Sequence, residues 1–252
     1  MRGGSVVFWI RLCPICGPIL NTRRSLPPAR LDGQVELINA HVNLGTIVFE
    51  KGEFGDALLT FDNSLAEMDK QLSLWPDEEL LAGVHLSGLA WRAGTLLELG
   101  RVREAAKGFS VLEAKAKVTS ERYPGSFRYR DDHTRALQRP GPTLTFLGDL
   151  EAGQKKLRES VRQAAVLLER ESDNFVLQFL YARGAWYLGR TLAGEEALAQ
   201  YVISHRGFAA IDFSGKRGVW LIDYVALLND LVLLLAECGE AERVIEYVRL
   251  AE

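Results

Sequence analysis

The sequence predicts an all-α fold, a right-handed α-solenoid of about five antiparallel helical hairpins. The first observation is a recurring phrase in which an apolar helical stretch meets a glycine and an amphipathic stretch follows. Its clearest copies turn at Gly52, Gly100 and Gly148, each 48 positions from the last (100 − 52 and 148 − 100), and weaker copies turn at Gly189 and Gly239. Self-similarity at a period of roughly 20–50 residues indicates stacked repeats. The second observation is that apolar residues recur every three or four positions, whereas strand-like alternation is scarce.

Composition places the 252-residue chain among ordinary soluble proteins, with 48% hydrophobic and 25% charged residues. The formal net charge of −3 argues against nucleic acid as the main partner, because nucleic-acid-binding surfaces are usually basic. No stretch approaches the roughly 18 apolar residues of a membrane span, so we expect no membrane contact. Three cysteines without a disulfide framework are typical of a reducing compartment, which predicts a cytoplasmic protein.

Residues 1–33 differ from the rest of the chain. Four prolines prevent a long helix there, and Cys13 and Cys16 form a pair without the two further ligands that a zinc site needs nearby. We expect 1–33 to be a disordered or non-native leader and 34–252 to be the helical repeat domain. The apolar end of the chain lacks an obviously polar capping helix, which predicts a piece of a longer array.

The first hairpin is predicted at 34–50 and 53–72. Gly52 is expected to end the first helix as a left-handed cap residue, since glycine tolerates that conformation. Apolar residues from Phe54 to Leu72 fall at spacings of three and four and form one stripe, which indicates an amphipathic helix. Two helices joined by so short a turn lie antiparallel.

The later helices are bounded by turn and capping residues. Proline and acidic residues after Trp75 mark one helix start, and Asn174 supplies a cap for another. The segment Pro140-Gly141-Pro142 is expected to split its helix, or to make it begin afresh near Pro142, because proline removes a backbone donor. The remaining predicted helices are 78–99, 101–121, 128–147, 149–171, 174–188, 192–206, 218–237 and 240–252.

The helix 218–237 is almost wholly apolar. Such a helix is either buried on most sides or packs against a neighbour outside the chain. We therefore expect possible self-association through the apolar C-terminal helices.

The residues around the first two turns resemble the tetratricopeptide repeat (TPR), which places small residues where paired helices approach and aromatic residues between hairpins. The third copy departs from this pattern at Pro140-Gly141 and at Gly153, which replaces alanine. The spacing exceeds the 34 residues of the family and is similar to the extended TPR-like arrays of bacterial multidomain ATPase-type transcriptional regulators and adenylate cyclases. The matching positions are Leu44-Gly45, Val48, Phe54, Ala57, Phe61 and Ser64 in the first copy, and Ala93, Leu96, Val102, Ala105, Phe109 and Leu112 in the second.

The chain contains no phosphate-binding GxxxxGK[ST] loop, no GxSxG elbow and no HExxH motif. We therefore predict no enzyme activity, no cofactor and no metal. The resemblance implies a scaffold module that binds a partner peptide, helix or domain on its concave face. Two alternatives stay open: a fragment of a larger ATPase-containing regulator or cyclase, and a small-molecule sensor with its ligand beside 218–237.

The predicted groove is lined by the first helix of each hairpin. Arg183 beside Trp186 and Phe179 is the best candidate anchor, since Arg and Trp are frequent hot-spot residues. The competing interpretation is that Trp186 and Phe179 are core residues between hairpins. Val42 and Thr46 occupy the places of the Lys/Asn clamp that holds carboxyl-terminal peptides, so that mode of binding is disfavoured. The groove candidates are Asn39, Thr46, Arg135, Gln138, Phe179, Arg183, Trp186 and Asn229.

A second candidate surface is an arginine-rich stretch interleaved with aromatic residues. Arg128 and Arg130 lie beside Phe127 and Tyr129, and arginine with aromatic neighbours can bind anionic groups. This predicts an anionic-partner patch at Arg128 and Arg130. The alternative is an inter-repeat loop whose arginines are neutralised by nearby acidic residues.

Overall fold

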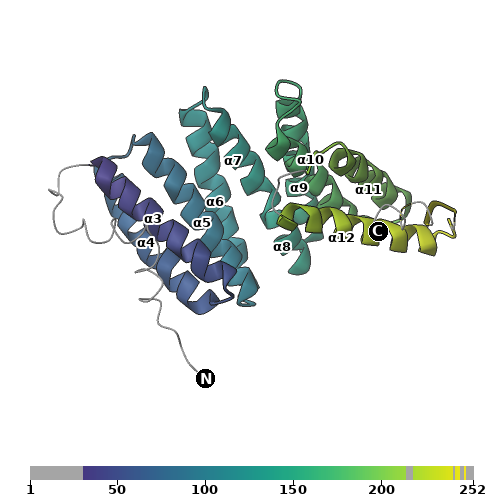
Figure 1. Cartoon of the computed structure of the whole chain (residues 1–252), viewed down its shortest axis with the longest axis horizontal. Coiled ribbons are helices and arrows are strands. Elements are labelled where there is room, and N and C mark those ends of the chain that lie inside the picture. Colours follow the sequence, from purple (N-terminus) through teal and green to yellow (C-terminus); the bar gives the residue numbers. More distant parts are fainter. Residues whose placement is uncertain (1–30, 214–217, 241, 245–246, 248–252) are drawn as a thin grey trace. The chain divides into compact units, whose positions relative to one another are not determined.

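The computed structural model describes residues 31–213, 218–240, 242–244 and 247, and these ranges contain no strand (Figure 1). Ten helices lie between Leu31 and Glu237, and the described residues 242–244 and 247 are helical as well. The all-α prediction is therefore confirmed. The predicted leader 1–33 and last helix 240–252 fall mostly outside the described residues, although Leu31 already belongs to a helix. The helices are α3 (Leu31–Glu50), α4 (Phe54–Leu74), α5 (Glu79–Glu98), α6 (Val102–Arg122), α7 (Phe127–Gln138), α8 (Pro140–Phe146), α9 (Leu150–Leu168), α10 (Phe175–Gly189), α11 (Gly194–Ala209) and α12 (Gly218–Glu237).

The chain divides into two compact units, Met1–Leu112 and Glu113–Glu252. In the first unit, α3 packs against α4, and α5 packs against both. Their shared core contains Phe61 and Met68, which are fully buried. A methyl group at Gly45 would lie 2.5 Å from the Phe61 ring, so glycine permits the close approach of α3 and α4. This is the position where the TPR pattern requires a small residue.

Four hairpin turns share one geometry. Gly52, Gly100, Gly148 and Gly239 all have positive φ, between 70° and 91°. At Gly52 the amide donates to Phe49 O at 2.8 Å, and the next amide donates to Val48 O at 3.3 Å. The other three glycines repeat this pair of hydrogen bonds. It is the Schellman motif, in which glycine takes the left-handed position that other residues resist.

The fourth predicted turn does follow Gly189, but Gly189 is not its left-handed residue. Gly189 has no positive φ and ends α10, where a methyl group would lie 2.5 Å from the Tyr201 ring. The left-handed glycine of this copy is Gly194, with φ of 55°, at the first residue of α11. Gly189 therefore permits close helix packing at the end of α10, while Gly194 supplies the left-handed residue at which α11 begins.

The predicted helix break at Pro140-Gly141-Pro142 is confirmed, and it falls just before Pro140. The helix α7 ends at Gln138, and α8 begins with Pro140 rather than near Pro142. Proline suits the first turn of a helix because its missing amide would have no helical partner there. A methyl group on Gly153 would lie 2.8 Å from Gly141 O, so α8 and α9 meet almost backbone to backbone.

In the second unit, consecutive helices from α9 to α12 pack on one another, and α7 and α8 both pack on α9. The main core lies among α10, α11 and α12, where Phe179 meets Phe208 edge to face with ring centroids 5.5 Å apart. Along α12, Leu227, Leu228, Leu231 and Leu235 are buried. The opposite side of α12 remains exposed, including Ile222 at 64% and Leu233 at 56%, so this helix is not buried on most sides. None of the helices described is long and apolar enough to cross a membrane.

Candidate functional site

The predicted groove residues fall in both units. Asn39 and Thr46 lie on α3 in the first unit, where both are half-buried and the Thr46 hydroxyl donates to Val42 O at 3.1 Å. Asn229 is exposed on α12 in the second unit. Arg135, Gln138, Phe179, Arg183 and Trp186 also lie in the second unit, on α7 and α10.

Gln138 connects α7 to α10 through both ends of its amide. Its Nε2 donates to Leu180 O at 2.8 Å, and its Oε1 accepts from Arg183 Nε at 2.6 Å. Gln138 is only 1% exposed, so these two bonds replace the hydrogen bonds that its side-chain amide would otherwise make with water. A methyl group at Gly184 would lie 2.9 Å from Gln138 Nε2, so the glycine leaves space for this side chain.

Arg183 also reaches α12. Its Nη1 lies 3.8 Å from Asp223 Oδ2, and its guanidinium stacks over the Phe179 ring at 5.0 Å. Burial lowers the pKa of Arg183 and raises the pKa of Asp223, because both charged forms lose contact with water. The structure thus brings Arg183 together with Phe179, its predicted neighbour, and with Gln138, whose contact with Arg183 the sequence did not predict.

The aromatic members of the predicted groove are core residues in this structure. Phe179 is 2% exposed and Trp186 is 5% exposed. The Trp186 indole donates to Asp230 Oδ2 at 2.8 Å, and Arg190 Nε lies 3.4 Å from the same carboxylate oxygen. Their burial leaves little surface for a partner, which favours the interpretation of these two residues as packing between hairpins.

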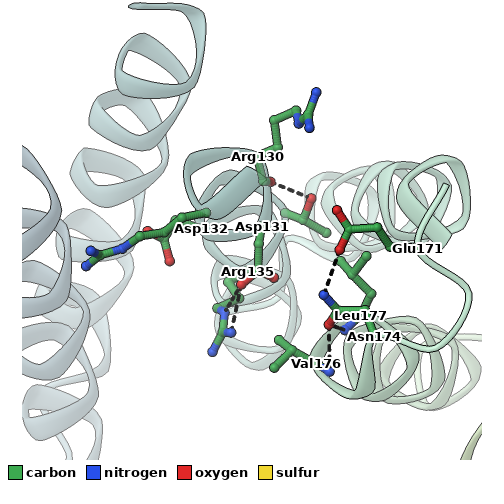
Figure 2. Close-up of polar contacts among 10 residues, drawn as sticks. Arg130, Asp131, Asp132, Arg135, Glu171, Asn174, Val176 and Leu177 are labelled. Carbon is green, nitrogen blue, oxygen red and sulfur yellow. Dashed lines mark hydrogen bonds and ion pairs between the residues drawn. The ribbon is translucent and has the colours of Figure 1, made fainter. Parts of the chain in front are cut away.

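Two further arginines stand near Arg183. Arg135 is bound to Asp131 on its own helix, with 2.8 Å between Nη2 and Oδ2, as Figure 2 shows. Arg139 follows the last residue of α7 and is exposed as a residue, although neighbouring protein groups partly shield its guanidinium from water. This partial loss of water, together with repulsion from Arg183, lowers the pKa of Arg139 to about 10, so the side chain stays charged at neutral pH. None of the ion pairs between described residues includes Arg139.

We call Arg135, Arg139 and Arg183 the arginine cluster. The sequence placed Arg135 and Arg183 in the groove, whereas it noted Arg139 only as part of the arginine-rich stretch. The i, i+4 spacing of Arg135 and Arg139 was the available signal, and it holds here because the backbone of Arg139 keeps helical angles.

The two residues of the predicted anionic patch have different surroundings. Arg128 is exposed, with its Nε 3.8 Å from Asp132 Oδ2, so a carboxylate already partly neutralises it. Arg130 instead lines a cavity of about 220 Å³ between the end of α6, α7 and α9. Sequence reasoning missed this cavity and the half-buried His133 in its wall. Within the described ranges, no group of three or more His, Cys, Asp or Glu side chains could hold a metal ion.

Comparison with known proteins supports the fold. No family model matches the sequence, and no curated protein matches it significantly. Among solved structures, the crystal structure of BtubC (BKLC) from P. vanneervenii matches with a TM-score of 0.68 and 10% identity, over 98% of this chain and 90% of that one. A candidate kinesin light chain from Podosopora anserina with nearly identical TPR-like repeats matches with a TM-score of 0.56 and 15% identity, over 86% and 95% of the two chains. A second crystal structure of that protein, in a substituted form, matches with a TM-score of 0.57 and 14% identity, over 88% and 95%.

At these identities the likeness shows the fold alone. It defines the chain as a TPR-like helical repeat protein, as the residues around Gly52 and Gly100 predicted. The finer resemblance to ATPase-type regulators finds no support among these structures and stays a prediction.

Proposed function

We propose that this chain is a non-enzymatic protein-interaction module that binds a partner peptide, helix or domain at the arginine cluster of the second unit. The TPR-like fold supports the general class, because such repeats typically bind proteins. The observation that carries the location is Arg139, an exposed residue near Arg183 whose charged and partly desolvated side chain has no ion-pair partner among the described side chains. A partly desolvated cation of this kind gains most from an anionic group that a partner brings.

The neighbouring side chains suggest how the partner is oriented. Arg183 is held by Gln138 and Asp223, so its position is fixed before a partner binds. Tyr187, half-buried beside it, lies 6.0 Å by its ring centroid from the Arg183 guanidinium. A preordered polar site of this kind loses little side-chain entropy on binding. We therefore expect acidic residues of the partner to meet Arg139, while Arg183 and Tyr187 position them.

Three further hypotheses accompany this proposal. The chain as a scaffold part of an ATPase-containing transcriptional regulator or cyclase rests on the sequence resemblance. Self-association rests on the exposed apolar side of α12, which includes Ile222 and Leu233. A cytoplasmic location rests on the cysteine content. Light scattering of the purified chain tests self-association, and a monomer at high concentration would count against it.

Capture of partners from a cell extract by the full chain tests the main proposal. Arg139→Glu reverses the charge at the cluster, and Lys115→Glu makes the same change at an exposed position of α6 as a matched control. Quantitative mass spectrometry should show a set of proteins that the wild type and Lys115→Glu retain and that Arg139→Glu loses at least tenfold. Equal capture by Arg139→Glu, with an unchanged circular dichroism melt, contradicts the proposal.

A further inference from the structure

The cavity between α6, α7 and α9 has a polar rim and an apolar wall. Arg130 and His133 of α7 and Gln163 of α9 supply polar groups, and Val166 and Leu167 of α9 supply apolar surface. All these residues belong to the second unit. A recess with one apolar wall and a few convergent polar groups is the usual form of a small-ligand site.

Arg130 is the unusual member of this rim. Its Nε is buried and has no hydrogen-bond partner, and its Nη1 makes only a 3.5 Å contact with Pro124 O. Figure 2 shows its side chain directed away from the Asp131–Arg135 pair. A buried guanidinium N–H without an acceptor is destabilising, because it has lost its hydrogen bonds to water and forms none within the protein.

The nearby cations, in contrast, have carboxylate partners. Arg162, which also lines the cavity, binds Glu159 through two hydrogen bonds of 2.9 and 2.6 Å. Those bonds lower the pKa of Glu159 to about 2, so this pair stays ionised and neutral overall. Among the described residues, Lys117 pairs with Glu121, Arg128 with Asp132 and Arg135 with Asp131, and no ion pair includes Arg130.

His133 adds no charge at neutral pH. Its burial lowers the pKa of the imidazole, so the ring is neutral and offers one donor and one acceptor. The cavity therefore carries a single uncompensated positive charge, which comes from Arg130. One positive charge complements a monoanion better than a phosphate dianion.

The volume limits the size of the ligand. A cavity of roughly 150 Å³ accommodates benzene, and drug-sized pockets begin at roughly 300 Å³. At about 220 Å³, this cavity suits an acid with a single ring or a short branched chain. The apolar wall at Val166 and Leu167 would contact the ring or chain, and the carboxylate would face Arg130.

We propose that this cavity binds a small organic monocarboxylate, whose carboxylate pairs with Arg130 and whose apolar part packs on Val166 and Leu167. The site is separate from the arginine cluster, and it needs no protein partner. The charge-assisted bond to a planar carboxylate supplies orientation, since the guanidinium presents its N–H groups in a fixed fork.

Titration of the full chain with benzoate, followed by two-dimensional NMR that includes the arginine Nε–H signals, tests the proposal. Saturable shifts should appear at the Arg130 Nε–H and at the amides of Val166 and Leu167, with affinity of about millimolar order for so small a ligand. Benzamide, the neutral isostere, should bind at least tenfold more weakly. Inorganic phosphate should not compete at equal concentration.

Two variants distinguish binding at the proposed site from nonspecific binding of benzoate. Arg130→Gln should weaken benzoate binding at least tenfold, whereas Arg128→Gln, two positions away and already paired, should leave it unchanged. Equal binding of benzoate and benzamide, no saturation, or full binding to a folded Arg130→Gln would each overturn the proposal. A peptide with acidic side chains that shifts the same signals more strongly than benzoate would also overturn it, in favour of a protein ligand. Arg139→Glu should leave benzoate binding intact, so this test and the partner-capture test fail independently.

Discussion

The side chains of Gln138 and Arg183 are joined by a 2.6 Å hydrogen bond across 45 positions of sequence. The glutamine lies at the end of α7 and the arginine lies in the middle of α10, so the bond connects two successive hairpins. The other end of the same amide holds Leu180 O. A single buried side chain therefore fixes both the packing of α10 and the position of a candidate binding residue.

Replacement of Gln138 by leucine should lower the free energy of unfolding by roughly 1–3 kcal/mol. The loss is expected because Arg183 Nε is left without an acceptor in a mostly buried place. Urea denaturation measures the change. Lys155→Ala, at an exposed position of α9, serves as the control and should stay within about 0.5 kcal/mol of wild type. A Gln138→Leu variant as stable as the control would show that the bond contributes nothing net.

Gly153→Ala should destabilise the fold by roughly 1–3 kcal/mol through overpacking. The added methyl group would lie 2.5 Å from Thr145 Oγ1 and 2.8 Å from the backbone oxygen of Gly141, which cannot swing aside. Gly94→Ala is the matched helical control, because nothing lies within 4 Å of its added methyl group. That control should gain roughly 0.5–1 kcal/mol. Thermal and urea unfolding of the two variants should therefore move in opposite directions.

Gly100→Ala should cost roughly 1–2 kcal/mol for a purely conformational reason. The glycine has φ of 70° and open space around the missing Cβ, so no steric contact with neighbours contributes. Gly100→Asn should cost less, because asparagine tolerates the left-handed region better than alanine. If alanine and asparagine prove equally stable in urea, the backbone explanation fails.

Stability should depend on the protonation of His133. Burial lowers the pKa of this histidine in the folded state, so the unfolded chain binds the proton more tightly. Its contribution to stability is therefore present above the ordinary value near 6.5 and is lost as the pH falls from that value through the lower pKa of the folded state. The free energy of unfolding of wild type relative to His133→Gln should decrease between pH 7.5 and pH 5.5. A pH-independent difference would contradict the assignment.

Local rules allowed much of the fold to be predicted. The Schellman turns at Gly52, Gly100 and Gly148 depend on a residue type and its immediate neighbours, so their spacing was visible in the sequence. The sequence did not show that Gly194, rather than Gly189, takes the left-handed conformation. The role of Gly189 depends on Tyr201 packing against α10. A glycine that permits close packing and a glycine that reverses the chain look the same in a sequence.

The candidate site could be predicted only in part, for the same reason. Arg183 and Gln138 were identified by their helix face, but their mutual bond depends on tertiary placement. The periodicity of Phe179 and Trp186 suits a groove and a core equally well, and only their contacts show them buried. Arg130 was identified by composition, whereas its unpartnered Nε and the cavity beside it need three helices to be in place.

The shared turn geometry has a consequence for how such a chain changes over evolutionary time. Four hairpins turn from their first helix into their second at the same pair of backbone hydrogen bonds around one left-handed glycine, as at Gly52 and Gly239. A duplicated hairpin of this kind would therefore carry its own turn geometry with it. Length can then vary in steps of one hairpin, while side chains such as Arg139 change the binding surface independently of the turns that hold it.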